Sequence, residues 1–436
     1  GYVFINRGLG DFQGYLSGWL SWFAHAVACS VYALSFGFYV LWLLAEYLLP
    51  RFGVELSLTG ATGWEKVAAI VTILAFGYIN YKGIKTTGRF QGIIVAIEVF
   101  ALLAFVGFGL VAFLSHPDWG NFHPFLGQGY WGLMAAMGLM YIGFEGSEII
   151  VQSGEEVKNP GKNIPRAIFI SFAIVIAFYI LVILVALGGV SGSWQDLSQA
   201  GQGTLVAAAG YFMPGWEWVV VVGGFLAALA ALNATVFSSS HVSFAMGRGG
   251  SLHPLLARIH PRHRTPYVAV AVSTLAIVLM AAFLPLKDVA SVADLLFILL
   301  FMQLHFAVIA LRKREPETER PFKVPLYPLP QIIALVAYFV LIWQFIHISP
   351  AGLAITIIWV LAGLLIYYAY SVPHGIEEIE KHTVFGEKMR FNEKAHYRIL
   401  LPLVPEPGWR AMLRIALSVA KAKEGEIHVL RITEVP

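Results

Sequence analysis

Ten runs of mostly apolar residues follow one another along this chain, separated by short segments rich in Gly, Pro and charge. A helix needs roughly 20 apolar residues to cross a bilayer core of about 30 Å. One such run is compatible with a buried helix of a soluble protein, but ten in succession are typical of a polytopic membrane protein. The runs lie near residues 14–48, 64–80, 90–115, 128–152, 166–190, 215–246, 266–285, 289–312, 328–348 and 351–371.

The composition agrees with lipid as the solvent. Hydrophobic residues make up 58% of the chain and charged residues only 13%, whereas soluble domains carry about 25% charged residues. The net charge of +3 does not indicate a nucleic-acid partner, because the basic residues lie in short loops between apolar runs. The single Cys29 excludes a disulfide framework. We therefore expect an all-α polytopic membrane domain over residues 1–371.

The loop charges predict the orientation of the ten spans, because cytoplasmic loops are enriched in Lys and Arg. Alternate loops carry fifteen such residues, and the loops between them, with their helix edges, carry three: Arg51, Lys66 and Lys287. This bias places the basic loops and the C-terminus in the cytoplasm. The sequence predicts a multi-pass protein of the cytoplasmic (inner) membrane.

The composition changes sharply after residue 371. Residues 372–395 are charge-rich and read as a cytoplasmic connector. An apolar strand at 397–403, an amphipathic helix near 408–423 and a second strand at 426–432 follow. This order is typical of the opening unit of a small α/β domain, so residues 396–436 are expected to form a partial α/β cytoplasmic domain that continues beyond Pro436.

Several loops contain sequence motifs that are not expected of membrane proteins in general. They are Tyr141–Glu145, Gly154–Pro160, Lys162–Ile168, Ala245–Arg248, His253–Pro254, Arg264–Pro266, Leu311–Pro316 and Glu319–Pro325. In this order and at these separations, they resemble the amino acid–polyamine–organocation (APC) family of secondary transporters. The resemblance covers essentially all of residues 1–371.

The resemblance implies the leucine-transporter-type fold, in which two inverted five-helix repeats surround the site. The start of the chain, Gly1–Gly10 and then Gly14–Trp19, matches the family's entry into its third helix. The ten spans are then helices three to twelve, and two further helices are expected upstream of Gly1.

The C-terminal segment resembles the start of a universal stress protein domain, through the strings Tyr397–Pro402 and Arg414–Lys423. An Asp usually ends the first strand in that family, whereas residues 403–406 here are Leu-Val-Pro-Glu. The family's glycine-rich phosphate loop would lie beyond Pro436, so nucleotide binding stays open.

The resemblance also implies a helix that is interrupted near the middle of the membrane, where half-helix ends offer partial charges to an amino acid. The interruption is expected within Leu139–Gly146, since Gly143 and Gly146 permit backbone that other residues resist. The alternative is a glycine pair that allows close helix packing. Substrate-binding residues are then Leu139, Tyr141, Ile142, Gly143 and Phe144. Leu139 stands where relatives often carry an aromatic gate, a departure from the family pattern.

Two carboxylates inside the spans are candidates for coupling to H+ or Na+. Glu145 closes the interrupted segment, and it is either a functional acid or a structural one capped by backbone N–H groups. Glu98 lies seven residues after Gln91, where some relatives carry a lysine that replaces a sodium ion. It either binds a proton, coordinates Na+ beside hydroxyls of Ser238–Ser240, or pairs with a histidine or a buried water.

Four histidines inside spans are either proton-relay groups or packing residues: His25, His241, His305 and His347. Glu155, Glu156, Lys158, Asn159 and Arg166 are expected to end the interrupted helix, either as structural residues or as an inner-gate charge network, with Pro165 in the first turn of the next helix. No metal-ligand spacing, nucleophile elbow or phosphate loop appears, so no cofactor, no metal and no enzyme activity are expected.

The sequence thus predicts a carrier of amino acids or related organic amines that works by alternating access and is driven by H+ or Na+. Two alternatives stay open: a transporter of an inorganic cation with the same fold, and a membrane sensor that signals through its cytoplasmic domain.

Overall fold

A computed structural model describes residues 2–54, 62–83, 88–152, 157–318, 320, 322–373, 398–403, 409–423 and 426–431. Contacts divide the chain into two units, Gly1–Glu378 and Ile379–Pro436. Each unit is described by itself below.

The first unit is built of helices. The principal ones are α1 (Tyr2–Leu9), α2 (Asp11–Leu43), α3 (Thr62–Lys82), α4 (Gly88–Ser115), α5 (Gly129–Leu139), α6 (Ser147–Gln152), α7 (Pro160–Gly188), α8 (Trp194–Gln199), α9 (Thr204–Phe212), α10 (Glu217–Arg248), α11 (Tyr267–Phe283), α12 (Leu286–Arg314), α13 (Leu329–Ile348) and α14 (Pro350–Ile366). The π-helical turns Leu44–Leu48 and Tyr367–Ser371 extend α2 and α14.

Seven helical segments among the described residues are long and apolar enough to cross a membrane. They are Asp11–Phe52, Gln91–Ser115, Pro160–Gly188, Glu217–Arg248, Leu286–Arg314, Leu329–Ile348 and Pro350–Ser371. The three other predicted spans coincide with α3, with the interrupted segment α5 to α6, and with α11, a helix of 17 residues. The chain is therefore a mostly helical, multi-pass membrane protein, as the apolar runs predict.

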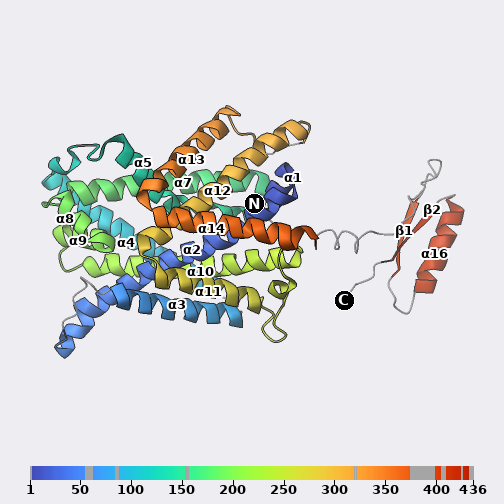
Figure 1. Cartoon of the computed structure of the whole chain (residues 1–436), viewed down its shortest axis with the longest axis horizontal. Coiled ribbons are helices and arrows are strands. Elements are labelled where there is room, and N and C mark those ends of the chain that lie inside the picture. The colour runs from blue at the N-terminus through green and yellow to red at the C-terminus, as the bar shows by residue number, and fades with distance from the viewer. Residues whose placement is uncertain are drawn as a thin grey trace. The chain divides into compact units, whose positions relative to one another are not determined.

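Helix α2 is the central element of the bundle, with α10, α12, α3 and α11 packed along it (Figure 1). Its middle turns carry small buried residues such as Ala24, Ala26 and Ala28, which allow neighbouring backbones to approach closely. Large aromatic rings fill the gap to α14, where Trp19 and Phe23 stack on Trp359 at 4.3 and 3.8 Å between ring centroids.

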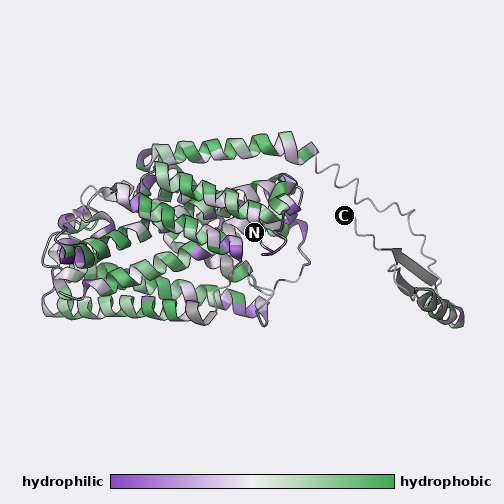
Figure 2. Ribbon diagram, turned by 90° about the horizontal axis from the view of Figure 1, so that it is seen from below, coloured by the Kyte–Doolittle hydropathy of each residue, from purple (hydrophilic) through white to green (hydrophobic). Residues whose placement is uncertain are grey.

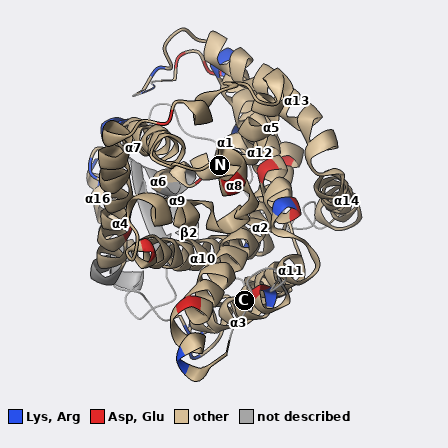
Figure 3. Ribbon diagram, turned by 90° about the vertical axis from the view of Figure 1, so that its left-hand side faces the viewer, with Lys and Arg blue, Asp and Glu red and all other residues tan. Residues whose placement is uncertain are grey.

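The outer surface of the bundle is apolar. Hydrophobic residues cover most of the long helices in Figure 2, and most of the ribbon in Figure 3 carries neither acidic nor basic residues. On α7, large exposed side chains include Phe169, Ile174 and Ile180. Monomeric soluble proteins rarely expose so large an apolar area, so this surface fits a lipid environment.

The sequence patterns miss the segment between α7 and α10, which folds into the short helices α8 and α9. A capping box begins α8, in which Ser193 and Asp196 bond each other's backbone N–H groups. These helices are too short to cross a bilayer, and no span-length apolar run marks them.

The second unit contains the strand β1 (Arg398–Leu403), the helix α16 (Trp409–Ala422) and the strand β2 (Glu426–Arg431). The two strands pair in parallel, with Arg398 opposite Glu426 and Leu403 opposite Arg431. A helix that connects two parallel strands is the expected crossover, so the strand–helix–strand order predicted from the sequence is confirmed. The predicted connector, residues 372–395, lies almost entirely outside the described residues.

Candidate functional site

The predicted interruption of a helix within Leu139–Gly146 is present. Helix α5 ends at Leu139, and a 3-10 turn follows over Tyr141–Phe144. Glu145 is extended, with φ −72° and ψ 162°, and Gly146 has φ +105°. Glycine is the residue that adopts this last conformation without steric cost. Helix α6 then begins at Ser147, so the backbone leaves the α-helical path for this octet, which we call the break.

Side chains of two neighbouring helices bond the backbone of the break. The N–H of Ile142 donates to Oδ1 of Asp294 on α12 at 2.6 Å. The hydroxyl of Tyr179 on α7 donates to the carbonyl oxygen of Gly143 at 2.5 Å. Backbone polar groups inside a membrane need such partners once the helical ladder is lost. In this conformation these two backbone groups are therefore bonded to protein side chains, and they do not lie open to a ligand.

The remaining predicted binding residues point to different neighbours. Tyr141 donates its hydroxyl hydrogen to the hydroxyl of Tyr338 on α13 at 3.1 Å. Leu139 packs into an apolar cluster formed by α12 and α13. Phe144 is 38% exposed and lies edge-on to the ring of Tyr179, with centroids 5.4 Å apart. The break thus presents one side to α12 and α13 and the other to α7.

A cavity of about 280 Å³ lies between the break and α7. Its walls are formed by residues 143–147 and Ile150, together with α7 residues that include Ile168, Ser171 and Phe172. Small-molecule sites span roughly 300–1,000 Å³, so the cavity is close to the lower limit for an amino acid or a small amine. Glu145 lies on its wall, and it forms at least one interaction of its own.

The two predicted coupling carboxylates lie on different elements. Glu98 lies on α4, which packs mainly against α10, α7 and α9, whereas Glu145 belongs to the break. One carboxylate oxygen of Glu98 is buried and has no hydrogen-bond partner among the described residues. Ser239 donates to the carbonyl of Trp22 at 3.2 Å and Ser240 to that of Phe237 at 2.9 Å. No hydrogen bond between described residues joins Glu98 to the predicted serine hydroxyls.

Asp294 is a functional candidate that was not predicted from the sequence. It lies on α12 with 0% of its surface exposed and bonds directly to the break. A signal for it exists, because an acidic residue inside an apolar run is rare and usually functional. The run 289–312 contains this one acidic residue, so the reasoning that points to Glu98 and Glu145 applies to Asp294 as well.

The first turn of α7 corrects a predicted helix start. Pro160 occupies the first position of the helix, and Asn159 precedes it with φ 49°. Pro165, expected in the first turn, lies inside the helix instead. A proline at the first position loses no helical hydrogen bond, so the helix begins earlier than the apolar pattern shows. Glu155 and Glu156 lie outside the described residues.

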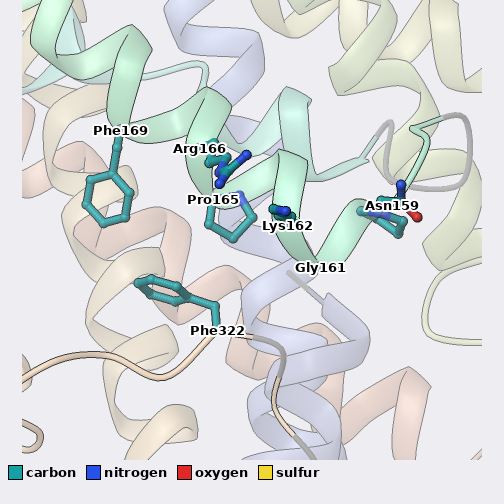
Figure 4. A pocket seen from close by; sticks show the side chains of 8 residues that line it. Asn159, Gly161, Lys162, Pro165, Arg166, Phe169 and Phe322 are labelled. Atoms are coloured by element: carbon teal, nitrogen blue, oxygen red, sulfur yellow. The ribbon is translucent and has the colours of Figure 1, made fainter.

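A second cavity of about 620 Å³ adjoins this turn. Lys162 and Arg166 line it together with the rings of Phe169 and Phe322, whose centroids are 5.8 Å apart (Figure 4). It contains none of the predicted binding residues. Among the described residues, no three His, Cys, Asp or Glu side chains gather in a group that could hold a metal ion.

Comparison with known proteins identifies the family. A family model described as "Amino acid permease" matches residues 1–371, which is the whole predicted membrane domain. The chain belongs to the amino acid permease family. The resemblance inferred from the loop strings is therefore confirmed for this part of the permease.

The names of three relatives of this permease indicate different substrates. The branched-chain amino acid permease BcaP of Bacillus subtilis is 27% identical over 384 residues, which are 86% of this chain and 79% of that protein. The methylthioribose transporter of the same organism is 26% identical over 383 residues, 86% and 80% of the two chains. Its serine/threonine exchanger SteT is 28% identical over 376 residues, 84% and 80%. All three are transporters by name.

Proposed function

We propose that this permease carries an amino acid or a related organic amine across the cytoplasmic membrane by alternating access, and that an H+ or Na+ gradient drives it. The observation that carries the proposal is the break at residues 139–146, within a segment that the apolar pattern embeds in lipid. Backbone dipoles at a helix interruption suit the carboxylate and ammonium groups of an amino acid.

Substrate binding is proposed at the break, through Leu139, Tyr141, Ile142, Gly143 and Phe144. In the described conformation Asp294 and Tyr179 hold the groups that a substrate would use. A substrate carboxylate therefore competes with Asp294 for the N–H of Ile142, and a substrate ammonium competes with the Tyr179 hydroxyl for the carbonyl of Gly143. Side-chain partners that a ligand replaces keep the polar backbone satisfied when the site is empty.

Glu98 and Glu145 are proposed to couple transport to the driving ion. The buried oxygen of Glu98 without a partner supports a role in binding a proton or Na+. We further propose that the C-terminus is cytoplasmic, as the loop charges indicate, that the membrane helices form inverted repeats, and that residues 396–436 begin a cytoplasmic α/β domain of the universal stress protein type. Its strand–helix–strand order supports this last point.

Counterflow in vesicles tests the proposal. Vesicles that contain the purified protein are loaded with one unlabelled solute, and entry of the labelled solute is followed from outside. The panel is branched-chain amino acids, serine, threonine, a diamine, methylthioribose and the inorganic cation Rb+. Entry of an amino acid or the diamine supports the proposal. Entry of methylthioribose or Rb+ alone, or of no solute, contradicts it, and protein-free vesicles give the background.

A further inference from the structure

Asp294 holds an unusual position, because one of its two carboxylate oxygens is enclosed without a partner. The side chain is fully buried. Oδ1 accepts the hydrogen bond from the N–H of Ile142, whereas Oδ2 has no hydrogen-bond partner among the described residues. An ionised carboxylate accepts at both oxygens, so one of its two acceptor oxygens is left without a hydrogen bond.

No positive charge offsets this carboxylate within the described residues. The ion pair between described residues joins Arg7 to Glu315, which lies at the opposite end of α12 from Asp294. Removing a carboxylate from water without a paired charge costs several kcal/mol, and the group avoids this cost when it takes up a proton. A proton on Oδ2 leaves Oδ1 free to accept from Ile142, so the neutral acid fits the observed geometry.

The titratable groups around Asp294 are two tyrosines, a glutamate and two histidines. Tyr141 in the break and Tyr338 on α13 lie on one side, with Glu145 near both. His305 lies on α12 itself, its ring 5.7 Å from that of Tyr338, and on α2 the ring of His25 is 5.4 Å from that of Phe297. The described residues of the other helices packed on this part of α12, namely α5, α11 and α14, contribute no acidic or basic side chain.

Release of a proton from Asp294 requires a change in the break. In the enclosed state water does not reach Oδ2, so the ionised carboxylate would not be hydrated. When the Oδ2–H bond breaks, its electron pair stays on the carboxylate and the proton passes to a water molecule. That water can enter only if the wall around Asp294 opens, and Ile142 is part of this wall. Opening of the break and loss of the proton are therefore linked.

We propose that Asp294 is a proton-carrying group of this permease, in addition to Glu98 and Glu145: it is neutral while the break is closed and gives up its proton when the break opens to water. This inference rests on the proposed function, since the break is also the proposed substrate site, and it commits the driving ion to H+. An ion other than H+ would need several oxygen ligands, whereas the geometry provides one unoccupied carboxylate oxygen.

The first test is Asp294→Asn, which keeps an oxygen that accepts from Ile142 and removes the exchangeable proton. Asp288→Asn is the matched control on the same helix, because Asp288 accepts from the hydroxyl of Ser349 at 2.6 Å and does not contact the break. We expect Asp294→Asn to lose the accumulation that a pH gradient drives, measured relative to the amino acid counterflow rate of the same variant. Asp288→Asn should accumulate like the unaltered protein. Full accumulation by Asp294→Asn, or accumulation that follows Na+ rather than pH, would overturn the inference.

The second test reads the proton directly and does not depend on transport. Five aspartates occur in the sequence, and Asp294 is the buried one. In protein labelled with ¹³C at the aspartate carboxyl, a neutral Asp294 gives the infrared C=O band of a carboxylic acid at neutral pH, shifted by the isotope. Absence of this shifted band in the unaltered protein overturns the inference. A permease without any amino acid counterflow that still shows the band would instead contradict the proposed function.

Discussion

The contact between Gly143 and Tyr179 makes the break open to a quantitative test. A Cβ atom added at Gly143 would lie 2.9 Å from the hydroxyl oxygen of Tyr179, closer than real Cβ atoms come. The next nearest atoms, Cζ and Cε2 of the same ring, would lie at 3.7 and 3.8 Å, which are ordinary contacts. The conflict that Gly143→Ala creates is therefore with one hydroxyl group.

The size of the effect follows from packing. Overpacking of this kind costs about 1–3 kcal/mol, and displacing the Tyr179 hydroxyl also weakens its hydrogen bond to Gly143, worth about 0.5–1.5 kcal/mol. If the bound state needs the observed backbone, the steric part alone lowers substrate affinity by about 5- to 150-fold. Gly143→Val places two further methyl groups on that Cβ and should abolish measurable substrate binding.

A double-mutant cycle separates the clash from other causes. Dissociation constants of an amino acid that the protein carries in counterflow are measured by calorimetry for the unaltered protein, Gly143→Ala, Tyr179→Phe and the double variant. We expect the double variant to bind about as well as Tyr179→Phe alone, because the phenylalanine ring leaves room for the added methyl group. Retained affinity in Gly143→Ala and Gly143→Val would refute the reasoning. So would a double variant as impaired as Gly143→Ala, since the hydroxyl would then not be the obstacle.

Three further outcomes are expected. Glu98→Gln should abolish ion-driven accumulation and leave substrate exchange partly intact, and unchanged accumulation across a pH and sodium series would count against its coupling role. Arg7 holds the pKa of Glu315 below its usual range through their hydrogen bonds, so the pair stabilises the fold near neutral pH and this contribution is lost as the pH falls through that lowered pKa. Melting temperatures of Arg7→Gln and the unaltered protein should therefore differ slightly near neutral pH and converge in acid; a gap that persists in acid would contradict this. Gly37→Ala should lower the melting temperature, because its Cβ would clash with the backbone oxygen of Glu65 on α3, whereas Gly107→Ala, with no atom within 4 Å, should not; equal melting temperatures would show that α2 and α3 tolerate separation.

The residue pattern was enough to predict the helical class and the strand–helix–strand order of the C-terminal unit, and the family resemblance added the break. These features are local. A membrane span is recognised by its length and apolar composition, and the glycines of one octet indicate where the break that the resemblance implies should lie. The family likewise follows from short loop strings between residues 141 and 325, whose spacing a single chain displays.

The side chains that bond the backbone of the break could be identified only from the packing of the helices. Asp294 reaches Ile142 across 152 positions of sequence and Tyr179 reaches Gly143 across 36, and no periodic pattern encodes such pairs. The neighbours of Glu98 on α4 could not be predicted either, because the sequence of an apolar helix does not indicate which other helix each of its faces contacts. In lipid every broken backbone bond needs a partner, and the packing of distant helices determines which side chain supplies it.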